Sequence, residues 1–171
     1  MNILLVLALI LFAAFTRLIP HSPNFTPVIS IALFAGAYLQ KRFAFLIPLA
    51  AMLMSDLIIG FYSPVSMAFV YGSFLLVVVL GLTMNGKVSM MKVGGFSLVG
   101  AVLFFVLTNF GVWLVPGSEY PKTLAGLVQC YILAIPFFSN TVVSAIVYSA
   151  ALFGIYGAAE KFVLKAKEVR A

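Results

Sequence analysis

The sequence predicts an all-α integral membrane protein, a bundle of six transmembrane helices with a short extra helix at the outer surface before the last span. Three observations support this prediction. Of the 171 residues, 64% are apolar and only 8% are charged, whereas about a quarter of a soluble domain is charged. The charged residues are separated by long apolar runs, and a helix needs about 20 apolar residues to cross a bilayer. Prolines and polar clusters fall between the runs.

The composition also excludes other classes of protein. A chain this apolar is not disordered, and a single cysteine, Cys130, cannot build a disulfide scaffold. The net charge of +6 does not indicate a nucleic-acid partner, because the basic residues lie between apolar runs and not on the face of a soluble body.

The first half of the chain contains three of the predicted spans. The apolar run from the N-terminus ends at Arg17, and three prolines between residues 20 and 27 forbid a continuous helix there. The next run is short and ends at the charged pair Lys41 and Arg42. These spans are Met1–Thr16, Thr26–Leu39 and Phe43–Gly60.

The second half contains the other three. A break at residues 62–64 precedes the fourth span, Ser66–Met84, and the fifth, Val93–Val115, ends before a proline-containing polar segment. The charge-free stretch 123–159 is too long for one straight crossing, because it would measure about 55 Å as a helix. We expect a break at Pro136, which makes Thr123–Ile135 a short helix at the outer surface and starts the sixth span after it.

The basic residues predict the orientation. With six spans, eight of the ten Lys and Arg residues fall on one face, and only Arg17 and Lys122 fall on the other. Cytoplasmic loops are enriched in such residues, so we expect a multi-pass protein of the bacterial inner membrane with both termini cytoplasmic. Residues 1–160 form the transmembrane domain, and residues 161–171 form a basic cytoplasmic tail near lipid headgroups.

The polar residues able to recognise a ligand collect on the predicted external side. They follow the first span, surround the end of the third, and lie near the end of the fifth and the start of the sixth. Such clustering favours a small-molecule site there. The candidate substrate-binding residues are Arg17, His21, Asn24, Asp56, Tyr62, Asn109, Trp113 and Asn140.

Asp56 is the only acidic residue inside an apolar span. Carboxylates inside a membrane face a partner or a wet cavity, and Arg17, at the outer end of the first span, is the partner we expect. Two roles stay open for the pair: ligand contact, or a structural ion pair that joins the first and third spans.

The sequence does not support catalysis, a cofactor or a metal site. It contains no glycine-rich phosphate loop, no nucleophile elbow and no paired carboxylates, so we predict no enzyme and no cofactor. One His and one Cys without ligand spacing do not indicate a metal site. His21 is interpreted as either a loop hydrogen-bonder or a proton-linked switch.

Small residues at helical spacing indicate close helix packing in lipid. Two such stripes occur, Ala32/Gly36 and Ala150/Gly154/Ala158. They pack inside the bundle or dock a partner membrane subunit.

Several segments together resemble a known family. They are Arg17–Pro27, Ile31–Tyr38, Pro48–Gly60 and Ile135–Thr141, and over about residues 14–160 the chain resembles DUF6580, a bacterial family of unknown function whose members are described as candidate transport proteins. In size and layout the chain also resembles the substrate-binding S components of energy-coupling factor (ECF) vitamin transporters. This resemblance implies a site enclosed by the external loops and the outer halves of the spans.

One feature of the S components is absent. They present small residues four apart on the first span to the coupling subunit, and Ala8, Ala13 and Ala14 do not have that spacing. The leading hypothesis is an uptake protein for a vitamin-like or micronutrient-like small molecule, bound from the extracytoplasmic side. The alternative is a non-catalytic accessory subunit of a larger membrane complex.

Overall fold

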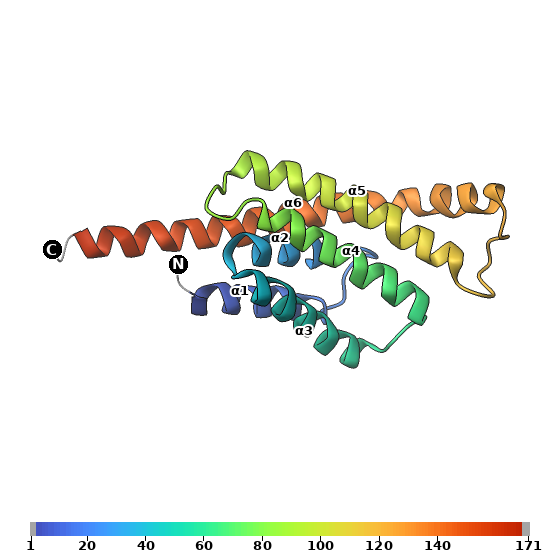
Figure 1. The fold of residues 1–171 in the computed structure, drawn as a ribbon, viewed down its shortest axis with the longest axis horizontal. Helices are drawn as coiled ribbons and strands as arrows, with labels where there is room; N and C mark the ends of the chain where they lie inside the picture. The colour runs from blue at the N-terminus through green and yellow to red at the C-terminus, as the bar shows by residue number, and fades with distance from the viewer. Residues whose placement is uncertain (1–2, 169–171) are drawn as a thin grey trace.

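The computed structural model describes the backbone of residues 3–168 and the side chains of residues 3–162. It is all-helical, with no strand in that part of the chain. Figure 1 shows the six helices, which are α1 (Ile3–Thr16), α2 (Val28–Tyr38), α3 (Lys41–Ile59), α4 (Pro64–Leu82), α5 (Met90–Leu114) and α6 (Leu124–Glu168).

The helices begin and end where the sequence supplies stop and start signals. Gly60 ends α3 with φ of 107°, a backbone conformation that L side chains rarely adopt. Pro64 stands at the first position of α4. An N–H group at this position has no acceptor within the helix, so the missing N–H of proline costs no hydrogen bond. Ser89 caps α5 by accepting a hydrogen bond from the backbone N–H of Lys92.

Four helices, α3 to α6, are long and apolar enough to cross a membrane. The other two are shorter. Helix α1 has 14 residues and α2 has 11, or about 21 and 16 Å, against a hydrocarbon core about 30 Å thick. The predicted positions of the first five helices agree with the structure, and four of the six helices are long enough to span a membrane.

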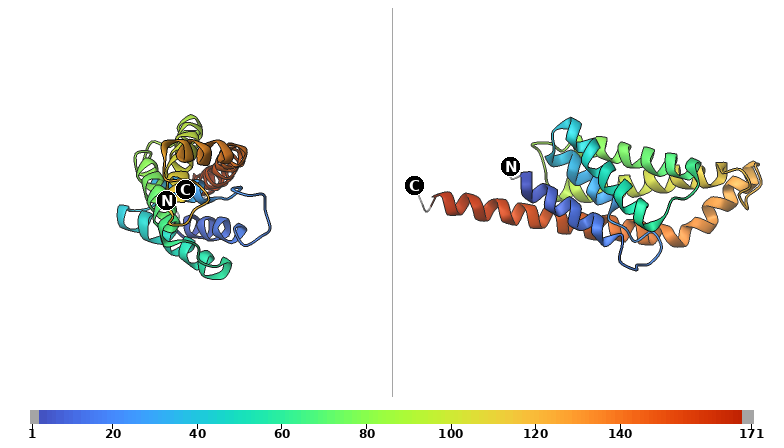
Figure 2. Two further views of the ribbon diagram at one scale, coloured as in Figure 1. Left: turned by 90° about the vertical axis from the view of Figure 1, so that its right-hand side faces the viewer. Right: turned by 90° about the horizontal axis from the view of Figure 1, so that it is seen from below.

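The separate surface helix predicted for Thr123–Ile135 is wrong. These residues belong to α6, a 45-residue helix with Pro136 inside it. Figure 2 shows that α6 changes direction in its orange part instead of breaking. Proline removes one hydrogen bond and tilts the helix, but in apolar surroundings nearby hydroxyls can compensate for part of this loss. The carbonyl that loses its helical donor here is that of Ile132, whereas Ser139 Oγ donates to the Pro136 carbonyl at 2.9 Å, so the hydroxyl does not replace the lost bond.

The predicted basic tail, residues 161–171, is partly described. The backbone continues as helix to Glu168. The side chains after Phe162 and the whole of residues 169–171 lie outside the described part of the chain.

The helices alternate in direction, so that the connections gather at two ends (Figure 1). We call one the loop end; it contains the connections 17–27, 60–63 and 115–123. The other is the basic end, where the described chain begins and ends and where the connections 39–40 and 83–89 lie. The cations at the basic end are Lys41, Arg42, Lys87, Lys92 and Lys161.

Helix α2 is the centre of the core. Every residue from Val28 to Ala37 is buried, and α2 packs on all five other helices. Its closest approach is to α4, because a Cβ atom on Gly36 would lie 2.4 Å from the Val78 carbonyl oxygen and one on Gly81 would lie 2.5 Å from that of Leu33. The Ala32/Gly36 stripe is thus buried within the bundle, whereas Ala150 and Ala158 on α6 are exposed.

We predict that Gly36→Ala destabilises the protein, because the added methyl group would force the α2 and α4 backbones apart. Overpacking of this kind costs about 1–3 kcal/mol. Gly72→Ala is the matched control on α4, since nothing lies within 4 Å of its added Cβ. Unfolding in detergent measures both variants, and equal stability of the two would contradict the close packing.

Candidate ligand-binding site

An ion pair between α1 and α3 lies near the loop end. Arg17 Nη2 is 2.9 Å from Asp56 Oδ1, and the side chains are 12% and 2% exposed. Arg17 follows directly after α1, and Asp56 lies one turn before the end of α3. The predicted pairing of these two residues is confirmed.

Three further groups complete the environment of the pair. The Tyr71 hydroxyl on α4 donates to Asp56 Oδ2 at 2.7 Å. Arg17 Nη1 donates to Ser55 Oγ and, at 3.5 Å, to the Met52 carbonyl. The carboxylate therefore has partners from two other elements, as a buried charge requires.

One hydrogen-bond donor of Arg17 is not used by these partners. The Nε atom is buried and has no hydrogen-bond partner among the described residues. Arg17 also lines a cavity of about 370 Å³ at the loop end. Cavities that bind small molecules have volumes of about 300–1,000 Å³, so this space suits a compact ligand.

The cavity has an apolar and aromatic base with polar groups around it. Phe104, Phe105, Met52 and Val70 supply the apolar walls. The polar lining residues are Arg17, Asn24, Thr26, Tyr62, Ser66, Thr108, Asn109 and Thr141. A lining of this kind is suited to a ring-containing molecule, because aromatic side chains can pack on the faces of the ring and polar groups can hydrogen-bond to its edge.

The N-terminus of α2 opens onto the same cavity. Val28 and Ile29 line it, and no side chain caps this end of the helix. The first N–H groups of a helix lack internal acceptors, so the cavity wall also offers backbone donors. Asn109 is oriented within α5, where its Nδ2 donates to the Phe105 carbonyl at 2.8 Å, which leaves its amide oxygen as an acceptor.

Four of the eight predicted site residues line the cavity: Arg17, Asn24, Tyr62 and Asn109. Asp56 is not part of the lining and lies behind Arg17. Asn24 has φ of 61°, in the left-handed region, which asparagine tolerates better than most residues.

The other three predicted residues make contacts elsewhere. His21 is exposed, with Nδ1 3.1 Å from the Ser22 carbonyl oxygen. Trp113 Nε1 donates to the Pro121 carbonyl at 2.9 Å, and Lys122 Nζ lies 5.6 Å from the Trp113 ring centre. Asn140 Nδ2 donates to the Pro23 carbonyl at 3.0 Å, which ties the 17–27 connection to α6.

Tyr71 and Ser66 belong to the candidate site, and the sequence did not single them out. Both lie inside the apolar run of α4. Tyr71 is the only tyrosine of that helix, and this is the one sequence feature that could have indicated its place in the site. Its position facing Asp56 depends on how α3 and α4 rotate against each other, and spacing alone does not show this.

We predict that Asp56→Asn is strongly destabilising. It leaves the buried Arg17 guanidinium without a counter-charge, and breaking a buried pair in this way costs about 3–5 kcal/mol. Tyr71→Phe removes one hydrogen bond to the carboxylate and costs about 1.5–3 kcal/mol. Unfolding measurements compare both with Glu119→Gln, an exposed acid; a loss for Asp56→Asn as small as for this control would contradict the pairing.

A second prediction concerns Tyr62, in the 60–63 connection. Burial raises the pKa of its hydroxyl from 10.0 to about 12; the negative charge of Asp56 adds to the increase and Arg17 opposes it. The folded protein therefore holds this proton more tightly than the unfolded chain, so the associated stability is complete below pH 10 and is lost as the pH rises towards 12.

Subtracting the ultraviolet titration of Tyr62→Phe from that of the wild-type protein isolates this hydroxyl. We expect its midpoint well above that of a free tyrosine. A midpoint at the ordinary value of 10.0 would show that the hydroxyl is fully solvated.

Comparison with known proteins finds one family. The family model DUF6580, described as a family of unknown function, matches residues 1–167. No curated protein and no solved structure matches the chain.

Proposed function

The chain belongs to the DUF6580 family, and from its loop-end cavity we propose that it is a membrane protein that binds a small vitamin-like or micronutrient-like molecule for uptake. The observation that carries the proposal is the cavity beside Arg17, of about 370 Å³, whose lining combines aromatic walls with polar groups from several helices and connections. We also propose that the protein is similar to the substrate-binding S components of ECF transporters.

The charges of the cavity favour an uncharged or weakly acidic ligand. The positive charge of Arg17 is balanced by Asp56, so a free anion gains less attraction than the arginine alone would give. The Arg17 Nε donor, the Tyr62 hydroxyl and the N–H groups of α2 favour a ligand with acceptor atoms at its edge. Asn109 supplies an acceptor for a donor on the same ligand.

The proposal includes the orientation in the membrane. The loop end faces outward and the basic end faces the cytoplasm of a bacterial inner membrane, because five cations at the basic end are opposed by Arg17 and Lys122 at the loop end. All six helices cross the membrane in this arrangement. The short α1 and α2 are accommodated because irregular backbone, here residues 17–27, is tolerated at depth where it lines a cavity.

A panel of water-soluble vitamins and related ring compounds tests the binding. A true ligand raises the unfolding temperature, since at 100 times Kd it adds about 2.7 kcal/mol of stability. Asn109→Leu should abolish this shift, because it removes an amide from the cavity wall. His21→Ala should retain it, because His21 lies outside the cavity lining. The absence of any shift across the panel with folded protein would contradict the proposal.

The alternative function, an accessory subunit of a larger complex, is favoured by one observation. Ala150 and Ala158 are exposed on α6, and nothing would lie within 4 Å of a Cβ atom on Gly154 between them. A stripe of this kind allows close approach of a helix from another subunit. Purification in mild detergent decides: a stoichiometric partner lost on Gly154→Leu would favour this function.

A further inference from the structure

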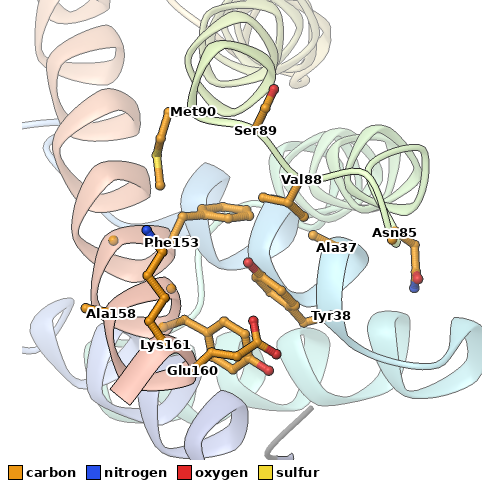
Figure 3. A pocket seen from close by; sticks show the side chains of 14 residues that line it. Ala37, Tyr38, Asn85, Val88, Ser89, Met90, Phe153, Ala158, Glu160 and Lys161 are labelled. Carbon is orange, nitrogen blue, oxygen red and sulfur yellow. The ribbon is translucent and has the colours of Figure 1, made fainter. Parts of the chain in front are cut away.

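A second and larger cavity lies at the basic end. It has a volume of about 790 Å³. Figure 3 shows the Tyr38 and Phe153 rings beside it, with Asn85, Glu160 and Lys161 around them. Like the loop-end cavity it combines aromatic rings with an amide, and its one acid and one cation balance in charge.

The two cavities lie at opposite ends of α2. Val28 and Ile29, at the start of the helix, line the loop-end cavity, and Ala37 and Tyr38, at its end, line the basic-end cavity. The helix has 11 residues and measures about 16 Å. A short buried helix therefore separates two spaces of similar chemistry.

The two sides of α2 are packed differently. Towards α4 the backbones meet directly at Gly36 and Gly81, which leaves no room for water or a ligand. Towards the basic end, α2 and α6 meet through buried aromatic rings, since the Phe34 ring centre lies 5.2 Å from that of Phe153 and 5.8 Å from that of Tyr156.

In the middle of α2 the contact towards α5 and α6 includes buried hydroxyls. Ser97 Oγ donates to Ser149 Oγ at 2.9 Å, Ser149 Oγ donates to Ser30 Oγ at 3.0 Å, and Ser30 Oγ donates to the Ala145 carbonyl at 3.0 Å.

This chain of hydroxyls lies between the cavities. Along α6, Thr141 lines the loop-end cavity and Phe153 lines the basic-end cavity. Ala145 and Ser149 stand between them at intervals of four residues, so the four positions form a stripe that winds slowly round the helix. The part of α6 that meets α2 is therefore a seam between the cavities, with hydroxyls in its middle and aromatic rings towards the basic end.

The hydroxyl part of this seam can open at low cost compared with an apolar contact, and the aromatic part offers ring faces to a ring-containing ligand. A hydroxyl that loses its protein partner can bond to water or to a passing ligand, and the net value of one hydrogen bond is only about 1 kcal/mol. A charged ligand would not be solvated well by three hydroxyls and a carbonyl, because an ion needs a counter-charge when it leaves water.

We propose that the seam between α2 and α6 is the route from the loop-end cavity to the basic-end cavity, and that the basic-end cavity is a second site for the same ligand, which is an uncharged, ring-containing polar molecule. The inference rests on the proposed function, because it assumes that the loop-end cavity receives the ligand. It adds the route, the second site and the charge state of the molecule that passes.

Thiol labelling tests the route without a known ligand. Cys130 is the only cysteine, so Cys130→Ala gives a background free of thiols. In this background Ser149→Cys reports on the seam and Thr26→Cys on the loop-end cavity. Val78→Cys is the matched control, since Val78 is as fully buried but lies on α4. Ser97→Cys repeats the seam measurement from α5.

The probes are N-ethylmaleimide, a small uncharged ring compound, and a quaternary-ammonium methanethiosulfonate of fixed positive charge. With N-ethylmaleimide we expect Ser149→Cys and Ser97→Cys to react roughly tenfold or more faster than Val78→Cys, because local opening is confined to the seam. With the charged reagent we expect Thr26→Cys to react and the two seam variants to stay as slow as Val78→Cys.

Three results would overturn the proposal. If the seam variants react with N-ethylmaleimide no faster than Val78→Cys while Thr26→Cys reacts, the route is wrong and the loop-end cavity stands. If the charged reagent reacts readily with the seam variants, the proposal that the ligand is uncharged is wrong. If Thr26→Cys is itself unreactive, the loop-end cavity is closed and the proposed function fails as well.

Discussion

The arrangement of the loop end depends on the ion pair between Arg17 and Asp56. Both charges are largely removed from water, and each would be very costly alone in apolar surroundings. The pair fixes the end of α1 against α3, and Tyr71 extends it to α4. The guanidinium forms part of the cavity wall with its charge balanced. The same contact thus holds three helices together and sets the polarity of the site.

The central helix gives the second constraint. Helix α2 is too short to cover the hydrocarbon thickness by itself and is buried along its length, so the space at its two ends is not filled by helix. Cavities are present at both ends. The glycine contact fixes α2 on α4, while its other side meets α6 through serine hydroxyls and through the rings of Phe34 and Phe153. The fold thereby combines one rigid interface of α2 with one that can exchange hydrogen bonds.

Much of this fold could be predicted from the sequence because charges, prolines and glycines divide the chain into apolar runs. The first five helices lie within a few residues of their predicted positions, and the pairing of Arg17 with Asp56 followed from there being one acid inside a span. The separate helix before Pro136 was wrong, because a proline can bend a helix in apolar surroundings without ending it.

The site was less predictable, because it depends on helix rotation and on the path of the connections. Asn140 and Trp113 lie near the loop end as expected, yet their side chains bond to the backbone of the connections. Tyr71 and Ser66 were hidden in an apolar run, and only the packing of α4 shows that they meet Asp56 and the cavity. Sequence gives the end of the bundle at which polar groups collect, but not which of them face inward.

The most direct test of this account is the coupling free energy between Arg17 and Asp56, measured by a double-mutant cycle with Arg17→Met and Asp56→Leu. If the pair organises the loop end, each single variant is strongly destabilised, the double variant recovers much of the loss, and the coupling is about 2 kcal/mol or more. Additive losses, with a coupling close to zero, would contradict the claim that the rest of the loop end depends on this pair.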